Sequence, residues 1–497
     1  MTEMFPAAEP IEATAAAEDP ADAAMSLAAR AAGPSRMGGA LRGDLTQGPI
    51  LKTLIAFSIP ALVANIFQTI GGSINAIWVG QLLGTSAVAA TANANIIMFL
   101  LFGTVFGFGM ATTIQVGRHY GGKDVVAARR SFGGGIGFCI ALALVVAVIG
   151  SLFAPAILRL MATPPEARDQ ALAYLRITFI SMPFTAAAMT IGMGLRGSGD
   201  ATTPMVSSII TVLLDIALNP MLIRGIGPFP RLGIAGSALS SASASVIGAG
   251  VMIATVYLRD LPLRLRGREL GFIVPSRAEL SFMLAKGFPM GAQVLISTAA
   301  GLVMVGLVNR QGLIAAAAYG ASLQLWNYVQ MPAMAIGSAM SGMVSQNIGA
   351  RQHHRVNAIT GAGIVATLAV TGTLTAAILL FDAPVLGLFL GHGSPAVPLA
   401  RHIQRICTWS FLMSGGTMAL FATMRAYGSV LVPLIILAVS MYAMRLGFYF
   451  LAHATLGNEA VWWAYPAGSI GSLGMGLLAW QYGPWRRAQA AAIVACR

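Results

Sequence analysis

Residues 196–204, RGSGDATTP, and residues 425–433, RAYGSVLVP, carry an arginine, a glycine and a proline at the same three positions. The members of each pair are 229 positions apart in the chain. The same offset relates Pro60 in FSIPA to Pro289 in KGFPM. A constant offset through separate landmarks indicates an internal duplication, in which two halves of one chain share a fold.

The composition places both halves in a membrane. Of the 497 residues, 57% are hydrophobic and 9% are charged, whereas soluble domains contain about 25% charged residues. Apolar stretches of about 20 residues, the length that crosses a bilayer, can be placed twelve times. We therefore expect an all-α membrane protein with spans over residues 52–80, 86–113, 131–155, 170–193, 203–223, 233–257, 281–308, 314–343, 358–381, 402–424, 430–452 and 461–482.

The distribution of Lys and Arg orients the spans. These residues are more frequent in the loops after even-numbered spans than in the loops after odd-numbered spans. Because basic loops stay on the cytoplasmic side, both termini are predicted to be cytoplasmic. Six spans per half bring each half back to its starting side, so a pseudo-twofold axis along the membrane normal should relate the halves, as in transporters that rock two halves about a central site.

The chain is expected to have five segments and no metal site. Cys139, Cys407 and Cys496 lack the spacing of metal ligands. The first segment is rich in Ala, Pro, Glu and Asp, a composition typical of disorder. In order, we predict a disordered cytoplasmic tail, a six-helix bundle, a basic cytoplasmic linker, a second six-helix bundle and a cytoplasmic tail, over residues 1–47, 48–258, 259–280, 281–484 and 485–497.

Asp215 is the acidic residue that the predicted spans place near the middle of the membrane, in TVLLDIALNP at 211–220. It lies eleven residues after Pro204, or about 16 Å along a helix, near the centre of a core about 30 Å thick. Asn219 lies one turn later on the same face. An isolated carboxylate at that depth indicates a functional site, and the alternative is a structural Asp held by hydrogen bonds between helices.

Amide side chains of the first, second and eighth spans share helix faces. Because polar groups in contact with lipid are costly, these faces should border the bundle interior or a watery cavity. The methionine of this set could instead be an ordinary packing residue. The predicted substrate cavity comprises Asn65, Gln68, Asn95, Gln324, Asn327 and Met331.

Arg445 is the cation that the predicted spans place well inside the membrane. We expect its side chain to reach outward past His453 toward the membrane surface. The alternative is an ion pair with a carboxylate, since the offset puts its neighbour Met444 at the position equivalent to Asp215. Such a pair would keep Asp215 ionised.

Several stretches, in their order along the chain, resemble the multidrug and toxic compound extrusion (MATE) family over about residues 48–487. They are HYGGKDVVAARR at 119–130, RGSGDATTP at 196–204, LNPMLI at 218–223, LGIAGSALS at 232–240 and QNIGARQHHRV at 346–356.

The resemblance implies a fold and a function. The twelve helices would form two bundles in a V around a central cavity. The protein would be a monomeric antiporter of the bacterial inner membrane that exports amphipathic, cationic small molecules in exchange for H⁺, with Na⁺ as the alternative ion. No other cofactor is implied.

The resemblance also locates ion coupling. In the DinF-like branch of the family, the N-terminal half carries an Asp on helix one, Asn-x-x-x-Asp-Pro on helix five and a hydroxyl residue on helix six. In the NorM-like branch, acids lie on helices seven and ten, where this chain has Ser297 and no acid. The resemblance therefore implies an N-terminal coupling site made of Asp215, Asn219, Asn75 and Ser241.

Other functions are less compatible with the sequence. A flippase for lipid-linked sugars, from the same wider superfamily, would need a cationic central cavity to hold pyrophosphate. A channel or receptor has no need of two matched halves around a single acid. The scattered basic residues form no nucleic-acid-binding face, and no nucleophile–base pair or phosphate-binding loop points to an enzyme.

Overall fold

The computed structural model describes residues 43–483, except residues 161–164, 228 and 392. The predicted C-terminal tail, 485–497, and residues 1–42 of the predicted N-terminal tail lie outside the described residues. The secondary structure of the described part is helical throughout, with no strand in it. The predicted all-α fold class is confirmed.

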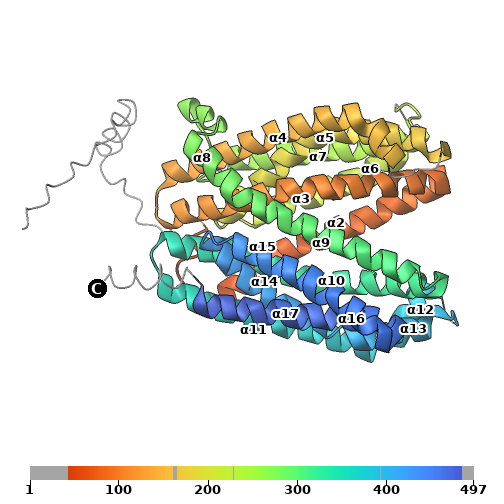
Figure 1. The fold of residues 1–497 in the computed structure, drawn as a ribbon. Helices are drawn as coiled ribbons and strands as arrows, with labels where there is room; N and C mark the ends of the chain where they lie inside the picture. The colour runs from red at the N-terminus through yellow and green to blue at the C-terminus, as the bar shows by residue number, and fades with distance from the viewer. Residues whose placement is uncertain (1–42, 161–164, 228, 392, 484–497) are drawn as a thin grey trace, which may run out of the picture. The chain divides into compact units, whose positions relative to one another are not determined.

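Six long helices make up the N-terminal half (Figure 1). They are α2 (Ile50–Leu83), α3 (Thr85–Gly121), α4 (Val125–Leu160), α5 (Pro165–Gly197), α6 (Thr202–Arg224) and α7 (Ile234–Leu258).

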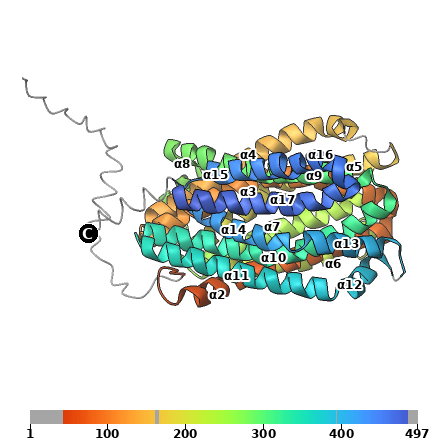
Figure 2. The same cartoon turned by 60° about the horizontal axis from the view of Figure 1, so that its bottom comes forward.

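The C-terminal half repeats this order with more interruptions. It comprises α8 (Arg277–Phe282), η2 (Met283–Gly287), α9 (Phe288–Asn309), α10 (Leu313–Gly349), α11 (His353–Leu380), α12 (Asp382–Leu390), α13 (Ala396–Cys407), α14 (Ser410–Ala426), α15 (Leu431–Ala438), η3 (Val439–Leu446), α16 (Gly447–Leu456) and α17 (Ala460–Tyr482). Figure 2 shows α10 beside α11, and the two helices are in contact.

The duplication extends to backbone torsions. Adding 229 to the bounds of α3 gives 314–350, within one residue of α10. Gly199 and Gly428, one in each repeated stretch, both have positive φ, at 86° and 80°. Lys123 and Arg351, at the ends of YGGK and IGAR, are non-glycine residues with φ of 63° and 57°. Left-handed backbone is rare outside glycine, so its recurrence at matched positions confirms that the halves share one fold.

The number of spans agrees with the expected twelve. By length and apolarity, nine helical runs of the described residues could cross a membrane, and α13 with α14, which meet at a bend of 45°, make a tenth. One of the nine, Leu431–Tyr482, contains two packed helices on either side of Gly457–Glu459, which adds another span. The 37-residue α10 is long enough but more polar, and it completes the twelve.

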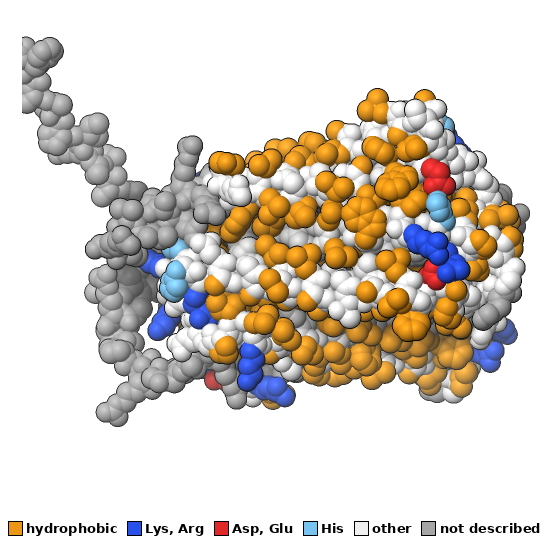
Figure 3. Space-filling view, turned by 90° about the horizontal axis from the view of Figure 1, so that it is seen from below, with side chains coloured by type: hydrophobic (Ala, Val, Ile, Leu, Met, Phe, Trp, Pro, Cys, Tyr) orange, Lys and Arg blue, Asp and Glu red, His pale blue; other side chains and the backbone are white. Residues whose placement is uncertain are grey.

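Each half has its own apolar core. Phe179 and Leu175 are fully buried in one cluster of the N-terminal half, and Trp326 and Trp462 are buried in one cluster of the C-terminal half. On the face drawn in Figure 3, hydrophobic side chains cover the middle and charged side chains lie toward the two ends. This is the distribution expected of a surface in contact with lipid, with charges at its borders.

The two halves meet backbone to backbone where α3 and α10 end. A Cβ atom added to Gly121 would lie 1.9 Å from the carbonyl oxygen of Gln346. One added to Gly349 would lie 1.9 Å from the carbonyl oxygen of Arg118. The Arg118 guanidinium donates hydrogen bonds of 2.6 and 3.1 Å to the carbonyl of Ala426 at the end of α14. Glycine is needed here because any side chain would force the two helices apart.

Residues 43–47 correct the predicted boundary of the N-terminal tail. Leu45 is buried, and its backbone N–H donates a 2.9 Å hydrogen bond to Gln346 Oε1. The Asn347 amide donates to the carbonyl of Leu45 at 3.1 Å. The tail was predicted to extend to residue 47, but this short segment has an apolar side chain to bury and amide partners on α10, so it is part of the fold.

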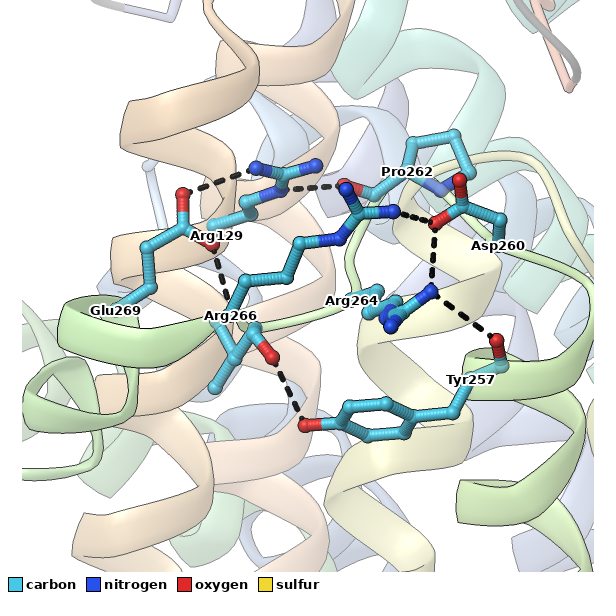
Figure 4. A network of polar contacts seen from close by, with 8 residues as sticks. Arg129, Tyr257, Asp260, Pro262, Arg264, Arg266 and Glu269 are labelled. Carbon is cyan, nitrogen blue, oxygen red and sulfur yellow. Dashed lines mark hydrogen bonds and ion pairs between the residues drawn. The ribbon is translucent and has the colours of Figure 1, made fainter.

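The linker between the halves is held by ion pairs (Figure 4). Arg129 of α4 donates to the carbonyl of Pro262 at 2.7 Å and pairs with Glu269 at 2.9 Å. Asp260 pairs with Arg264 and Arg266. Those arginines, Arg266 above all through its hydrogen bond, lower the pKa of the exposed Asp260 carboxyl. Residues 260–269 of the predicted linker, 259–280, are thus a structured segment fixed to α4 of the N-terminal half.

Candidate coupling site and central cavity

Asp215 lies inside α6, thirteen residues after Thr202 and nine before Arg224. At 1.5 Å per residue it is about 20 Å from one end of the helix and about 14 Å from the other. Ser240 and Ser241 of α7 donate hydrogen bonds to its Oδ1 atom, at 2.7 and 3.0 Å. Among the described residues, no Lys, Arg or His pairs with this carboxylate and no hydrogen bond reaches Oδ2.

Ser240 has two acceptors on the same residue. Its Oγ atom lies 2.7 Å from the Asp215 carboxylate and 3.0 Å from the Asp215 backbone carbonyl. A hydroxyl has one hydrogen to donate, so it can serve only one of them fully. The charged carboxylate attracts that hydrogen more strongly. When the carboxylate is neutral, the hydroxyl can turn to the carbonyl without leaving a polar group unpaired.

A second set of polar groups lies next along α6 and α7. The Asn219 amide nitrogen donates to Asn75 Oδ1 of α2 at 2.6 Å, and the Ser237 hydroxyl donates to the same oxygen at 3.1 Å. Asn219 is fully buried, and its own Oδ1 atom has no hydrogen-bond partner in the described structure. A buried oxygen left without a donor is unfavourable, which fits a site where a proton donor or a cation binds and leaves.

The structure brings the four predicted coupling residues into one region. Asp215, Asn219, Asn75 and Ser241 come from α2, α6 and α7, which pack together. Ser237 and Ser240 belong to the same region and were not predicted. Their signal lies in GSALSSAS at 236–243, where residues 237, 240 and 241 fall on one helix face.

A cavity of about 490 Å³ lies mainly in the C-terminal half. Its walls come from α9, α10, α14, α15, η3 and α17, with part of α3. They combine aromatic and methionine side chains with hydroxyl and amide groups: Phe99, Phe106, Met110, Met290, Gln293, Val294, Ser297, Thr298, Leu323, Trp326, Asn327, Gln330, Met334, Ser338, Phe411, Ser414, Thr417, Met418, Phe421, Arg425, Leu437, Ser440, Met441, Arg445, Tyr465, Gly468, Ser469 and Ser472.

The predicted cavity residues are only partly those that line this cavity. Asn327 is one of its lining residues. Gln324, one turn away, instead donates to the Tyr328 hydroxyl at 3.3 Å. Helical periodicity shows which residues share a face but not which neighbour covers that face. Four other residues predicted to line the cavity are, like Gln324, not among its lining residues. They are Asn65, Gln68, Asn95 and Met331.

Arg445 corrects a further expectation, because it turns inward and does not reach out past His453. Its guanidinium carbon lies 4.2 Å from the centre of the Tyr465 ring, and the residue is 9% exposed. It lines the cavity, forms no ion pair in the described chain, and its Nε atom lacks a hydrogen-bond partner. The alternative pairing with Asp215 is not formed either.

The family is decided by a match in each half. The MatE family model matches residues 60–221 and 289–451, so the two matches begin 229 residues apart. The chain belongs to the MATE family. It is therefore a multi-pass membrane protein whose two bundles correspond to the two matched repeats.

The relatives of this MATE chain have names that refer to different substrates. A "Probable multidrug resistance protein YoeA" of Bacillus subtilis is 33% identical over 428 residues, which are 85% of this chain and 92% of that protein. An "FAD transporter" of Shewanella oneidensis is 26% identical over 314 residues, which are 63% of this chain and 69% of that protein.

Solved MATE structures show the same fold. One described as an outward-facing conformation of a multidrug resistance MATE family transporter has a TM-score of 0.82 and 21% sequence identity. The match covers 91% of this chain and 99% of the other. The two-bundle, twelve-helix architecture predicted from the duplication is confirmed by this likeness.

Proposed function

We propose that this MATE-family chain is a secondary antiporter that exports amphipathic small molecules in exchange for H⁺, with Na⁺ as the alternative ion. The observation that carries the proposal is the state of Asp215. It is a carboxylate deep inside a span, held by two hydroxyl groups and paired with no cation among the described residues. Such a group can take up and release a proton within a transport cycle.

The hydrogen bonds around Asp215 suit both states of that cycle. The ionised state keeps Ser240 and Ser241 as donors to Oδ1, while Oδ2 is open to a proton or a cation. In the protonated state, Ser240 can donate to the backbone carbonyl of Asp215. The site lies between α2, α6 and α7, so a change of its charge would alter how these three helices pack.

The rest of the proposal concerns the substrate and the membrane. The names of the relatives favour small organic substrates. One name refers to multidrug resistance and another to transport of FAD, a dinucleotide. The proposal includes a monomer in a bacterial inner membrane with both termini cytoplasmic. The basic residues near the ends of α3 and α14, such as Arg118 and Arg425, support the orientation of the termini. A cationic substrate was expected from the family, but the charges of the cavity do not favour one.

A lipid-linked sugar flippase fits the cavity less well. Two arginines line it, as pyrophosphate binding would require. However, Arg425 is one residue from the end of α14, and Arg445 lies fourteen residues beyond Leu431, where the next span begins. At 1.5 Å per residue they are about 20 Å apart along the membrane normal, too far to hold one pyrophosphate together.

The test is transport by the full chain in proteoliposomes. We expect an imposed pH gradient to drive substrate movement in the wild type and not in Asp215→Asn. The matched control is Asp169→Asn, an exposed carboxylate of α5, which should transport normally. Movement driven by a sodium gradient and indifferent to pH would reject H⁺ and favour Na⁺. Full activity of Asp215→Asn under both gradients would overturn the proposed coupling site.

A further inference from the structure

The charges that line the central cavity all have one sign. Its charged side chains are Arg425 and Arg445, and no Asp or Glu among the described residues lines it. An arginine stays protonated in proteins, so these charges persist at any physiological pH. A cationic substrate entering the cavity would meet like charges, whereas an anionic one would meet opposite charges.

Arg445 is placed to receive an anion. Its guanidinium packs against the Tyr465 ring, which fixes its orientation without occupying its hydrogen-bond donors. The residue is nine-tenths buried, and its Nε donor is unsatisfied in the described structure. A buried donor on a charged group is costly unless a partner reaches it. A carboxylate, sulfonate or phosphate in the cavity would supply that partner through paired hydrogen bonds.

The remainder of the cavity suits an apolar or aromatic body. Phe106, Met290, Phe411 and Met418 come from three different helices, α3, α9 and α14, and face the same space. Methionine and aromatic side chains adapt to ligands of varied shape. A cavity of about 490 Å³ is within the range of small-molecule sites. It is large enough for a fused aromatic ring system.

We propose that this cavity binds amphipathic anions, with the anionic group at Arg445 and the apolar body along the Phe and Met wall. The inference rests on the proposed export function for its role in transport, but binding itself requires no gradient. It replaces the expected cationic substrate class with an anionic one. The proposed ion coupling depends on Asp215 in the N-terminal half, and the proposed anion binding depends on Arg445 in the C-terminal half. Either proposal can therefore fail without the other.

The decisive experiment compares two dyes on the detergent-purified full chain. Fluorescein and rhodamine 123 share a xanthene ring system, and at pH 8 the first is anionic and the second is cationic. We expect the wild type to bind fluorescein more tightly in fluorescence polarisation titrations. Arg445→Gln should weaken fluorescein binding about tenfold or more, because a hydrogen-bonded charge pair is lost. Binding of rhodamine 123 should be unchanged or tighter.

Two further variants make the result specific. Arg445→Lys keeps the charge but loses the paired donors, so fluorescein affinity should fall between wild type and Arg445→Gln. Arg310→Gln, an exposed arginine after α9, should bind both dyes as the wild type does. If Arg445→Gln does not fold, two measurements still test the inference. They are the wild-type preference for fluorescein over rhodamine 123 and the loss of fluorescein affinity in Arg445→Lys. Tighter binding of rhodamine 123 by the wild type, or fluorescein binding indifferent to residue 445, overturns the inference.

The outcome is independent of ion coupling. Asp215→Asn should bind fluorescein with wild-type affinity. Arg445-dependent binding without gradient-driven transport by the wild type would reject the antiporter and keep the anion site. Gradient-driven transport by the wild type, together with dye binding that does not depend on Arg445, would keep the antiporter and reject the anion site.

Discussion

The two halves carry opposite charges at almost the same place in the repeat. The offset of 229 takes Asp215 to Met444, the neighbour of Arg445, and takes Ser240 to Ser469. In the N-terminal half, Ser240 donates to a carboxylate in a compact polar site. In the C-terminal half, Ser469 and Arg445 line an open cavity. One scaffold thus presents a small acidic site in one copy and a large basic cavity in the other.

The difference begins with the helix that carries the charge. In the N-terminal half α6 is continuous from Thr202 to Arg224, whereas its counterpart contains the π-helical segment η3, Val439–Leu446. A π-helical turn holds more residues than an α-helical one, so side chains after it face other directions than in a regular helix. Such turns are frequent at functional sites. Under the proposed function, the repeats would have separate tasks, ion coupling in one and substrate binding in the other.

The largest expected effect of a single change is that of Asp215→Asn. It should abolish gradient-driven export and leave dye binding in the C-terminal cavity unchanged, because it removes the group proposed to exchange the ion. Adding Asn219→Asp should restore part of the export, with a shifted pH optimum, since the new carboxylate would lie beside Asn75 and Ser237. Transport by reconstituted variants measures both. Loss of dye affinity in the single variant would mean that the tasks are not divided.

The next effect is expected from the paired serines. Ser240→Ala should raise the pH of half-maximal export by about one unit, because the ionised carboxylate loses a hydrogen-bond donor. Ser469→Ala, its equivalent, should leave that pH unchanged, since its partner is the Ser414 hydroxyl and no carboxylate. The pH profile of export tests the pair. An equal shift of the pH of half-maximal export in both variants would contradict the assignment of ion coupling to the N-terminal half.

A smaller effect separates two neighbours on α10. Asn327→Ala should change the relative export rates of different substrates, by about threefold for a neutral hydrogen bond, because Asn327 lines the cavity. Gln324→Ala should change them little, since its amide interacts with Tyr328 outside the cavity lining. Export of a panel of dyes gives the ratios. An effect larger at Gln324 would place the substrate elsewhere.

The smallest effect is expected at the linker, which joins the halves without contributing to either site. Arg266 and Arg264 lower the pKa of the Asp260 carboxyl, so the ionised form is favoured in the fold. Its stabilisation is present at neutral pH and is lost as the pH falls below about 4, through the folded pKa. Asp260→Asn should lower the Tm slightly at pH 7 and leave export unchanged. The Tm difference should vanish in acid, and its persistence there would contradict the ion pairs.

The sequence was sufficient for the fold and for most of the polar region around Asp215. A constant offset and twelve apolar stretches predicted two six-helix halves, because membrane helices are long and their number is readable from composition. Asn75, Asp215, Asn219 and Ser241 were placed together by the family resemblance. Ser240 was missed because the resemblance names one hydroxyl position, although the helix face of α7 carries several.

The cavity was less predictable. Arg445 was expected to point outward, but the π-helical η3 and the Tyr465 ring turn it inward, and neither is visible in the residue pattern. Asn65 and Gln68 share a polar face, yet a face alone does not reveal which helix lies against it. The lining of a cavity depends on contacts between elements, so it requires the structure.

The contact between Gly121 and Gln346 offers a way to separate the two halves by a single substitution. No methyl group fits between that α-carbon and the carbonyl 1.9 Å from where its Cβ would lie. Gly121→Ala would therefore act as a wedge that keeps the ends of α3 and α10 apart while leaving both the acidic site and the basic cavity untouched.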